Sequence, residues 1–380
     1  MPGAMVIGGA TCKAPGARAP QREASRLPAG AAGRAFGGAL TMGGALHASS
    51  VTVRRRVAAR AVMNEGSSAE ASGDTIEPAR KLVRQPGSTT GPFNVLITGS
   101  TKGIGRALAE EFLKRGDSVL VCSRTERSVR SAVKDLSSRY DPERVRGIAC
   151  DVSDQESVER LAAFATEQFG AIDLWINNAG SNGYKFEALS ESEGDMLEEI
   201  VSTNVLGTLV CCRQAIRTMR EQPAGGHIFL MDGAGGSGTP TPRFAAYGAT
   251  KRCLGQLIKS LNAELKTAAL SDKVCVHNLS PGMVTTQLLM SGTDSPQAKW
   301  FINCLAEEPH VVAQNLVPRL RDVPAASKKN ADASGALSSR TVAFLTPVDA
   351  VTRIGSRILF ERSRNRFVQE EGDSRLPPLG

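Results

Sequence analysis

Apolar and polar positions alternate along this chain in two distinct ways. Short, nearly continuous apolar runs predict strands at 94–98, 118–123, 145–152, 172–180, 226–232 and 273–282. Between them, apolar residues recur every three or four positions. This spacing predicts helices at 104–115, 126–138, 154–169, 196–221 and 244–268, and another that starts near Pro347. Apolar strands that alternate with helices predict an α/β fold with one doubly wound parallel sheet and helices on both faces.

The two ends of the chain lack this pattern. Residues 1–62 are rich in Ala, Gly, Ser and Arg, and their nine Lys and Arg against one acid account for the net charge of +8. This composition predicts a chloroplast transit peptide, with a disordered basic tail as the alternative. Because the remainder is neutral, we expect no nucleic-acid partner. We further expect a disordered linker at 63–92, the folded domain at 93–323, a polar loop insertion at 324–343, and a C-terminal helix and tail at 344–380.

Hydropathy and cysteine spacing narrow the class of protein. No window approaches the roughly 18 apolar residues of a membrane span, so we expect membrane contact to be peripheral at most. The eight cysteines are scattered and include no C-x-x-C pair. We therefore expect buried thiols in a reducing compartment and no metal site.

A glycine-rich turn follows the first predicted strand. The segment TGSTKGIG (98–105) lies between that strand and a predicted helix, where glycines allow a tight turn and close approach of the backbone to a pyrophosphate. The helix N-terminus then faces the phosphates with its partial positive charge. The cofactor-binding residues predicted here are Gly99, Ser100, Thr101, Lys102, Gly103, Ile104 and Gly105.

Residues after the next strands bear on the choice of cofactor. The second strand ends at Ser123 and Arg124, where an acid would favour NAD; with Lys102 nearby, two cations and no acid favour NADPH, and NADH is the alternative. Asp151 and Val152 follow the third strand, where a carboxylate can meet the adenine amino group. The segment NNAG closes the fourth strand and contributes Asn178, Ala179 and Gly180 to the cofactor side.

Tyr247 and Lys251 are four residues apart on one predicted helix, and therefore lie on the same face. A neighbouring ammonium stabilises a phenolate, so we expect Lys251 to lower the pKa of Tyr247 toward the working range.

These motifs, in this order, resemble the short-chain dehydrogenase/reductase family over residues 92–322, which implies a single Rossmann-type domain. The resemblance implies that Tyr247 donates the proton, that Lys251 activates it and holds the nicotinamide ribose, and that Asn204 relays protons through water. It also assigns Pro281, Gly282, Val284 and Thr285, after the sixth strand, to the cofactor.

One family residue is missing. The serine thirteen positions before the tyrosine is Ala234 here. Ser237 in the glycine-rich loop, a protonated Asp232, or backbone amides of residues 233–236 could supply the lost hydrogen bond. We assign Ser237 as the candidate catalytic residue.

A narrower resemblance concerns the substrate. The segments MDGAGGSGTPTPRFAAYGATK, HNLSPGMVTTQLLMSG and KWFINCLAEEP resemble the chlorophyll b reductases that lack membrane spans. This implies NADPH-dependent reduction of the ring formyl group of chlorophyll b or chlorophyllide b to a hydroxymethyl group, in the chloroplast stroma or on the thylakoid surface. It further implies antenna protein, a membrane-spanning isoform and homo- or hetero-oligomers as partners. A reductase of 3-oxoacyl chains or another small carbonyl, and a non-catalytic NADPH-binding subunit, are the alternatives.

Apolar residues after the sixth strand fit the same substrate. They either offer a surface to a porphyrin or pack the loop that covers the site. They are Met283, Leu288, Leu289, Met290, Trp300 and Phe301.

Overall fold

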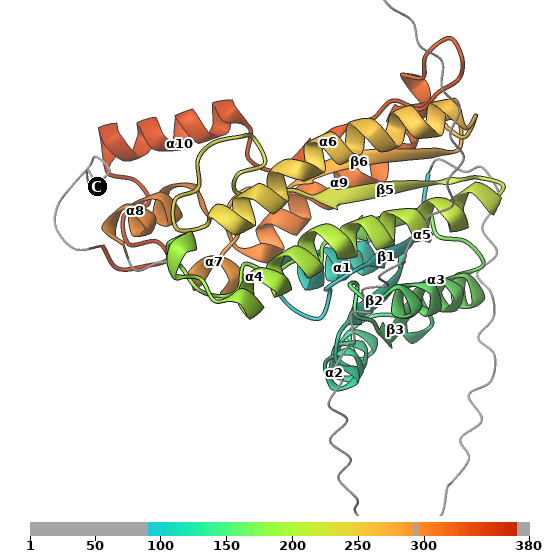
Figure 1. Ribbon diagram of the computed structural model, residues 1–380, viewed down its shortest axis with the longest axis horizontal. Helices are drawn as coiled ribbons and strands as arrows, with labels where there is room; N and C mark the ends of the chain where they lie inside the picture. The colour runs from blue at the N-terminus through green and yellow to red at the C-terminus, as the bar shows by residue number, and fades with distance from the viewer. Residues whose placement is uncertain (1–89, 292–294, 371–380) are drawn as a thin grey trace, which may run out of the picture. The chain divides into compact units, whose positions relative to one another are not determined.

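Seven parallel strands form one sheet in the computed structural model, which describes residues 90–291 and 295–370 (Figure 1). The strand order is β3-β2-β1-β4-β5-β6-β7. The strands are β1 (Asn94–Ile97), β2 (Ser118–Ser123), β3 (Val145–Ala149), β4 (Leu174–Asn177), β5 (Gly226–Met231), β6 (Val274–Ser280) and β7 (Thr341–Ala343). The order reverses between β1 and β4, so a crevice opens at their carboxyl ends.

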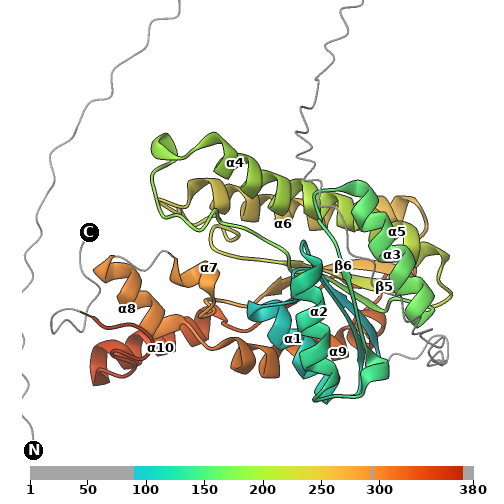
Figure 2. The same cartoon turned by 90° about the horizontal axis from the view of Figure 1, so that it is seen from below.

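Helices cover both faces of the sheet (Figure 2). One face carries α1 (Gly103–Lys114), α2 (Glu126–Ser137) and α9 (Pro309–Lys329). The other carries α3 (Gln155–Phe169), α5 (Gly207–Glu221) and α6 (Ala245–Thr267). Between α5 and the shorter α4 (Gly194–Val201), residues Ser202–Leu206 form a π-helical turn. The predicted α/β fold with helices on both faces is confirmed.

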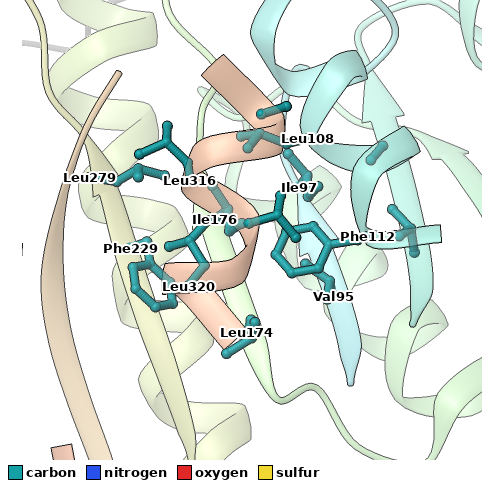
Figure 3. Close-up of a cluster of buried hydrophobic side chains, with 14 of the residues drawn as sticks. Val95, Ile97, Leu108, Phe112, Leu174, Ile176, Phe229, Leu279, Leu316 and Leu320 are labelled. Carbon is teal, nitrogen blue, oxygen red and sulfur yellow. The ribbon is translucent and has the colours of Figure 1, made fainter. Parts of the chain in front are cut away.

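The core explains why the strands read as continuous apolar runs. Alternate residues of β1 point to opposite faces, and each meets a helix layer: Val95 and Ile97 pack with Phe112 of α1 and Leu316 of α9 (Figure 3). The intervening Leu96 joins the opposite cluster. Burying an aliphatic or aromatic side chain of this size contributes about 1.5–3 kcal/mol. A strand buried on both faces needs apolar residues at every position.

The structure differs from the predicted polar loop at 324–343. Helix α9 continues through Lys329 although Pro318 and Pro324 lie within it, and the seventh strand β7 follows. Ser327 is fully buried, and its hydroxyl donates to the Ser338 carbonyl oxygen at 2.6 Å. The two ends of the predicted loop therefore belong to a helix and a strand, which their composition alone did not indicate.

Three helices lie beyond the carboxyl end of the sheet: α7 (Gln287–Met290), α8 (Pro296–Leu305) and α10 (Pro347–Phe360) (Figures 1 and 2). The helix predicted near Pro347 is α10. The predicted transit peptide at 1–62, nearly all of the predicted linker at 63–92 and the last ten residues of the predicted tail lie outside the described residues. Within the described part of the chain, no helix is both long and apolar enough to cross a membrane.

Candidate active site

A cleft of about 360 Å³ lies at the carboxyl ends of β1, β2, β3 and β4, where the strand order reverses. Most of the residues predicted to bind the cofactor line it: Gly99, Thr101, Lys102, Gly103, Ile104, Gly105, Ser123, Arg124, Asp151, Val152, Asn178, Ala179 and Gly180. Eight further residues complete the lining: Cys150, Ser181, Tyr184, Glu199, Thr203, Thr286, Gln287 and Leu288. The cleft therefore unites segments that span almost 190 residues of sequence.

The glycine turn is shaped by the segment that follows β4. Gly99 has a φ of +62° and lies against Ala179, and Gly103 has a φ of +60°, so both occupy the left-handed region. A Cβ atom on Gly105 would lie 2.8 Å from the Gly99 carbonyl oxygen and closer still to the Asn178 amide. The side-chain amide of Asn178 in turn donates to the carbonyl oxygens of Thr98 and Gly99, at 2.7 and 3.0 Å. The glycines thus serve close packing of two loops as well as access for a phosphate.

Two members of the turn make hydrogen bonds that join it to other segments. Ser100 is fully buried; its hydroxyl donates to the Ile97 carbonyl oxygen at 2.6 Å and accepts from the Cys122 amide at 3.1 Å. It does not line the cleft. Lys102 extends across the mouth, where its Nζ donates to Gln287 at 3.2 Å and lies 5.3 Å from the ring centroid of Tyr184. Lys102 therefore links the glycine turn to the segment that follows β6.

The end of β2 presents a hydroxyl and a guanidinium to the cleft. The Ser123 hydroxyl oxygen is buried and has no hydrogen-bond partner among the described residues. Arg124 is exposed and lies 3.6 Å from a carboxylate oxygen of Glu199. An unpartnered hydroxyl beside an exposed cation fits an anionic oxygen of a ligand, such as a ribose phosphate.

The residues after β3 lie in the cleft wall as predicted, and their contacts show how they are held. Asp151 accepts from the amide and the hydroxyl of Ser153, at 2.9 and 2.7 Å. Val152 packs against Gly207 at the start of α5, where a Cβ atom would lie 2.7 Å from a Val152 methyl group. Asp151 is thereby fixed at the edge where an adenine would lie.

Tyr247 and Lys251 share one face of α6, next to the end of β5. Lys251 is 6% exposed, and its Nζ donates to the Met231 carbonyl oxygen at 2.9 Å. The same nitrogen lies 5.6 Å from the ring centroid of Tyr247. A Cβ atom on Gly180 would lie 3.7 Å from this nitrogen, so the lysine reaches the loop that lines the cleft. Neither Tyr247 nor Lys251 is part of the cleft lining itself; Tyr247 lines a separate small pocket with Asn182 and Met196.

The electrostatics of this pair differ from the prediction. Burial raises the pKa of Tyr247, and the Asp232 carboxylate raises it further, so the expected net shift toward the working range is not found. Burial lowers the pKa of Lys251 to about 8, against an opposing effect of Asp232. Tyr247 therefore keeps its proton across the neutral range, which suits a group that donates one. Lys251 is positively charged only below about pH 8.

Asn204 lies in the π-helical turn between α4 and α5 and is fully buried. Its amide donates to the Ser181 carbonyl oxygen at 2.8 Å and to the Thr250 hydroxyl at 3.0 Å, and its side-chain oxygen accepts from the Ser181 amide at 2.8 Å. Its own carbonyl oxygen accepts from the Thr208 hydroxyl at 2.7 Å. The side chain therefore joins the cleft wall to α6, and the water-relay role stays a prediction.

The loop that lacks the family serine runs close to Tyr247 without offering a side-chain hydroxyl to it. A Cβ atom on Gly233 would lie 2.5 Å from the Tyr247 hydroxyl oxygen. The Gly233 amide donates to the Asp232 carboxylate at 2.8 Å. Ser237 is exposed, and its hydroxyl lies 3.0 Å from that of Thr239. Ala234 is exposed as well, so neither of these two positions is brought to the tyrosine.

After β6, the residues that line the cleft are Thr286, Gln287 and Leu288, none of which was among the four predicted positions. Thr285 lies off the cleft: its amide donates to the Glu307 carbonyl oxygen at 3.0 Å, and its hydroxyl lies 3.3 Å from the same oxygen. Thr286 lines the cleft, with its methyl group near Gly103. Pro281, Gly282 and Val284 are outside the lining; a Cβ on Gly282 would lie 3.0 Å from Leu345. A count from the proline does not reveal which threonine turns inward.

Other residues of the cleft carry no local signal in the sequence. Tyr184 has a φ of +55° and reaches the mouth from the loop after β4, and Leu288 reaches it from α7. Trp300 is 1% exposed and packs edge-on against Phe301 at 5.0 Å, so it packs the covering segment and offers no open surface to a ligand. Of the apolar residues proposed for a porphyrin surface, only Leu288 lines the cleft in the described part of the chain.

Comparison with known proteins agrees with this geometry. The sequence model described as short chain dehydrogenase matches residues 94–297. The chain is 50% identical over 322 residues to chlorophyll(ide) b reductase NOL, chloroplastic, of Oryza sativa subsp. japonica, covering 84% of this chain and 90% of that protein. The protein of the same name from Arabidopsis thaliana is 50% identical over 300 residues, or 79% and 83% of the two chains.

A solved structure extends the likeness to three dimensions. The 3-ketoacyl-(acyl-carrier-protein) reductase of Brucella melitensis complexed with NADH aligns with a TM-score of 0.54 and 25% identity, covering 68% of this chain and 98% of that chain. The shared fold, with the cleft of this chain at the carboxyl ends of the strands, is that of nicotinamide-dependent oxidoreductases. The family match covers more than half of the sequence and includes the glycine turn, Tyr247 and Lys251. This chain belongs to the short-chain dehydrogenase family.

Proposed function

We propose that this protein is a chloroplast reductase that uses NADPH to convert the ring formyl group of chlorophyll b or chlorophyllide b to a hydroxymethyl group. The aldehyde gains a hydride at carbon and a proton at oxygen, and NADPH becomes NADP⁺. The observation that carries the proposal is 50% identity to chlorophyll(ide) b reductase NOL over 90% of that protein. The reaction is the first step from chlorophyll b to chlorophyll a.

Tyr247 and Lys251 supply the proton chemistry. The Tyr247 hydroxyl keeps its proton because its pKa is raised, and it donates that proton to the aldehyde oxygen. A nicotinamide held by the residues of the cleft would supply the hydride for the aldehyde carbon. Lys251, held by the Met231 carbonyl oxygen, places a positive charge beside the phenol as negative charge develops there. Asn204 holds the Gly180 loop against α6, which fixes the position of the proton donor relative to the cleft.

The residues of the cleft fit NADPH. The glycine turn at 99–105 leaves room for a pyrophosphate at the N-terminus of α1. The unpartnered Ser123 hydroxyl and the Arg124 guanidinium would hold a 2′-phosphate, and Lys102 adds a second cation at the mouth. An acid at the end of β2, which would favour NADH, is not found at Ser123 or Arg124.

The location and partners follow from the relatives and belong to the same proposal. The relatives are named chloroplastic, which supports a chloroplast location, either in the stroma or at the surface of the thylakoid membrane. A transit peptide at 1–62 would deliver the chain there. Antenna protein, as a carrier of the pigment, and a membrane-spanning isoform are the proposed partners, and association into homo- or hetero-oligomers is expected.

Reduction of a 3-oxoacyl thioester is the second candidate, since the aligned structure from Brucella melitensis is a 3-ketoacyl reductase. Ala234 in place of the family serine weighs against it. A non-catalytic NADPH-binding subunit is the third candidate, and the Tyr247–Lys251 pair on one face of α6 weighs against that one.

A single incubation series separates these candidates. The full chain and NADPH are mixed with chlorophyll b, chlorophyllide b or an acetoacetyl thioester, and the pigment products are identified by chromatography and mass. We expect NADPH oxidation and a hydroxymethyl product with a tetrapyrrole. Oxidation with the thioester alone would support the second candidate. NADPH binding without turnover of any substrate would support the third.

A further inference from the structure

Helix α10 buries Arg357 on one side, together with the half-buried Ile354 and Ile358, and exposes large apolar side chains on the other. Val348, Val351, Gly355 and Leu359 recur at intervals of three or four residues and form one stripe along the helix. Arg357 lies on the opposite side of the same helix. An amphipathic helix of a water-soluble domain normally buries the apolar stripe and exposes the charges.

The inward face is held by specific contacts. Arg357 is 1% exposed; its guanidinium donates to the Glu370 carboxylate at 2.6 Å and lies 6.0 Å from the ring centroid of Trp300 on α8. Asn303 of α8 donates to the same Glu370 at 2.7 Å and accepts from the Val368 amide at 3.0 Å. The orientation of α10 is therefore fixed by a buried arginine and by the segment that follows the helix.

The outward face exposes large apolar side chains. Val348, Val351, Leu359 and Phe360 have exposed fractions of 74%, 69%, 68% and 68%, the highest of the large apolar residues in the described part of the chain. Nothing lies within 4 Å of a Cβ atom built on Gly355, in the middle of the stripe. We call Val348, Val351, Gly355, Leu359 and Phe360 the α10 stripe. Such a contiguous exposed stripe marks an interaction surface.

Positive charge lies directly beside the α10 stripe. Between Glu361 and Arg366, the chain carries three arginines against one acid. Arg362 stacks over Phe360 at 5.7 Å, and Arg364 is exposed. An apolar helix face flanked by arginines matches the two layers of a lipid surface, in which anionic headgroups lie above acyl chains.

We propose that the α10 stripe docks on an anionic lipid membrane. The charge pattern favours lipid over the chain's own last ten residues, EGDSRLPPLG, which contain two acids and one arginine but only two large apolar residues. The stripe lies at the end of the molecule that carries α7 and α8, beyond the carboxyl end of the sheet (Figures 1 and 2). Leu288 of α7, at the same end of the molecule, lines the cleft, so docking brings that end of the molecule to the bilayer. If the proposed function holds, a lipid-soluble pigment then enters without crossing water.

Vesicle flotation tests this docking without any turnover. The full chain is mixed with phosphatidylcholine vesicles with or without phosphatidylglycerol. We expect flotation with phosphatidylglycerol, and a roughly tenfold or larger drop in the partition coefficient for Val351→Ser/Leu359→Ser. The matched control Val201→Ser/Leu209→Ser alters two residues that are 50% and 44% exposed on α4 and α5, and it should float like the parent. The basic N-terminal segment is present in every variant, so its contribution cancels.

A charge variant completes the test. Arg362→Gln/Arg364→Gln should lose most of the dependence on phosphatidylglycerol and keep any residual binding to neutral vesicles. NADPH binding and the thermal melting of each variant show that the fold is intact. Equal flotation of parent and Val351→Ser/Leu359→Ser would overturn the proposal. So would a lipid-free dimer that this variant dissociates, or flotation seen only after the chain is shortened at Glu370, since these assign the stripe to a second copy or to the tail.

Failure here and failure of the proposed function are separate results. Flotation requires no substrate, whereas the reductase assay uses chlorophyllide b in solution without a membrane. Val351→Ser/Leu359→Ser should retain the parent rate with dissolved chlorophyllide b and lose rate only with chlorophyll b held in phosphatidylglycerol vesicles.

Discussion

The two ends of the candidate site are built differently. We call the glycine turn with the Asn178 loop the phosphate end, and Tyr247 with the loop from Asp232 to Ser237 the carbonyl end. At the phosphate end, the glycine turn and the Asn178 loop hold each other through the Asn178 amide and the contact of Gly99 with Ala179. At the carbonyl end, the loop from Asp232 to Ser237 approaches Tyr247 through a glycine and leaves its serine in solvent. The first end matches the family pattern, and the second departs from it.

This difference separates a part of the site that is fixed by two interlocking loops from a part that depends on one backbone approach. At the phosphate end, the glycine turn and the Asn178 loop constrain each other. At the carbonyl end, the Gly233 backbone comes close to the Tyr247 hydroxyl. The predictions below test each end in turn, beginning with the largest expected effect.

Replacing Tyr247 with Phe removes the proton donor and leaves the ring in place. We expect kcat for chlorophyllide b to fall about 10³-fold, within the range typical of a lost general acid. NADPH binding, followed by quenching or enhancement of its fluorescence, should be unchanged, because Tyr247 lies outside the cleft lining. A Tyr247→Phe protein as active as the parent would show that the carbonyl end takes its proton from elsewhere.

Arg124→Leu tests the phosphate end. Losing a charged hydrogen bond to a phosphate costs about 1.5–3 kcal/mol, so we expect KM for NADPH to rise about 10- to 100-fold. KM for NADH should change by less than about twofold, since no 2′-phosphate is present. Arg127→Leu, an exposed arginine three residues away on α2, is the control. A parallel loss with both cofactors would instead assign Arg124 to general charge in the cleft.

Part of the fold could be predicted from the sequence. Strands buried on both faces are mostly apolar, so β1 to β6 and the helices between them follow from the pattern. Strand β7 has three residues, and α9 continues through Pro324, so both are decided by packing and not by local preference. Periodicity shows that α10 is amphipathic but not which face is buried, because that depends on Arg357 meeting Trp300.

The same holds for the candidate site. Lys251 and Gly105 belong to short motifs whose chemistry constrains their spacing. Tyr184 and Leu288 reach the cleft mouth from separate loops, and no local pattern indicates that they do. The pKa of Tyr247 rises because the site is desolvated, which depends on the whole fold.

The pH dependence of the rate tests whether the charge on Lys251 is needed at the carbonyl end. Lys251 is charged below its pKa of about 8, so kcat/KM should fall as the pH rises through this value. Asp232 raises the pKa of Lys251, and Asp232→Asn removes that effect. The descending limb should therefore move to lower pH in Asp232→Asn. Glu198→Gln, which neutralises an exposed acid on α4, should leave the limb in place. An unshifted limb in Asp232→Asn would show that another group titrates.

Ser237→Ala should have the smallest effect, and it decides how the missing serine is replaced. Ser237 is exposed and paired with Thr239, so its removal should change kcat by less than about twofold, as for most surface substitutions. A true hydrogen-bond donor to the carbonyl oxygen would cost about 2.7–4 kcal/mol, or 10²- to 10³-fold. Gly233→Ala is the contrast in the same loop, because its Cβ would lie 2.5 Å from the Tyr247 hydroxyl and should displace the proton donor. A small effect of Ser237→Ala beside a large effect of Gly233→Ala would mean that the carbonyl end depends on how closely the backbone approaches Tyr247. A hundredfold loss in Ser237→Ala would mean that the loop rearranges when substrate binds and brings this hydroxyl to the aldehyde.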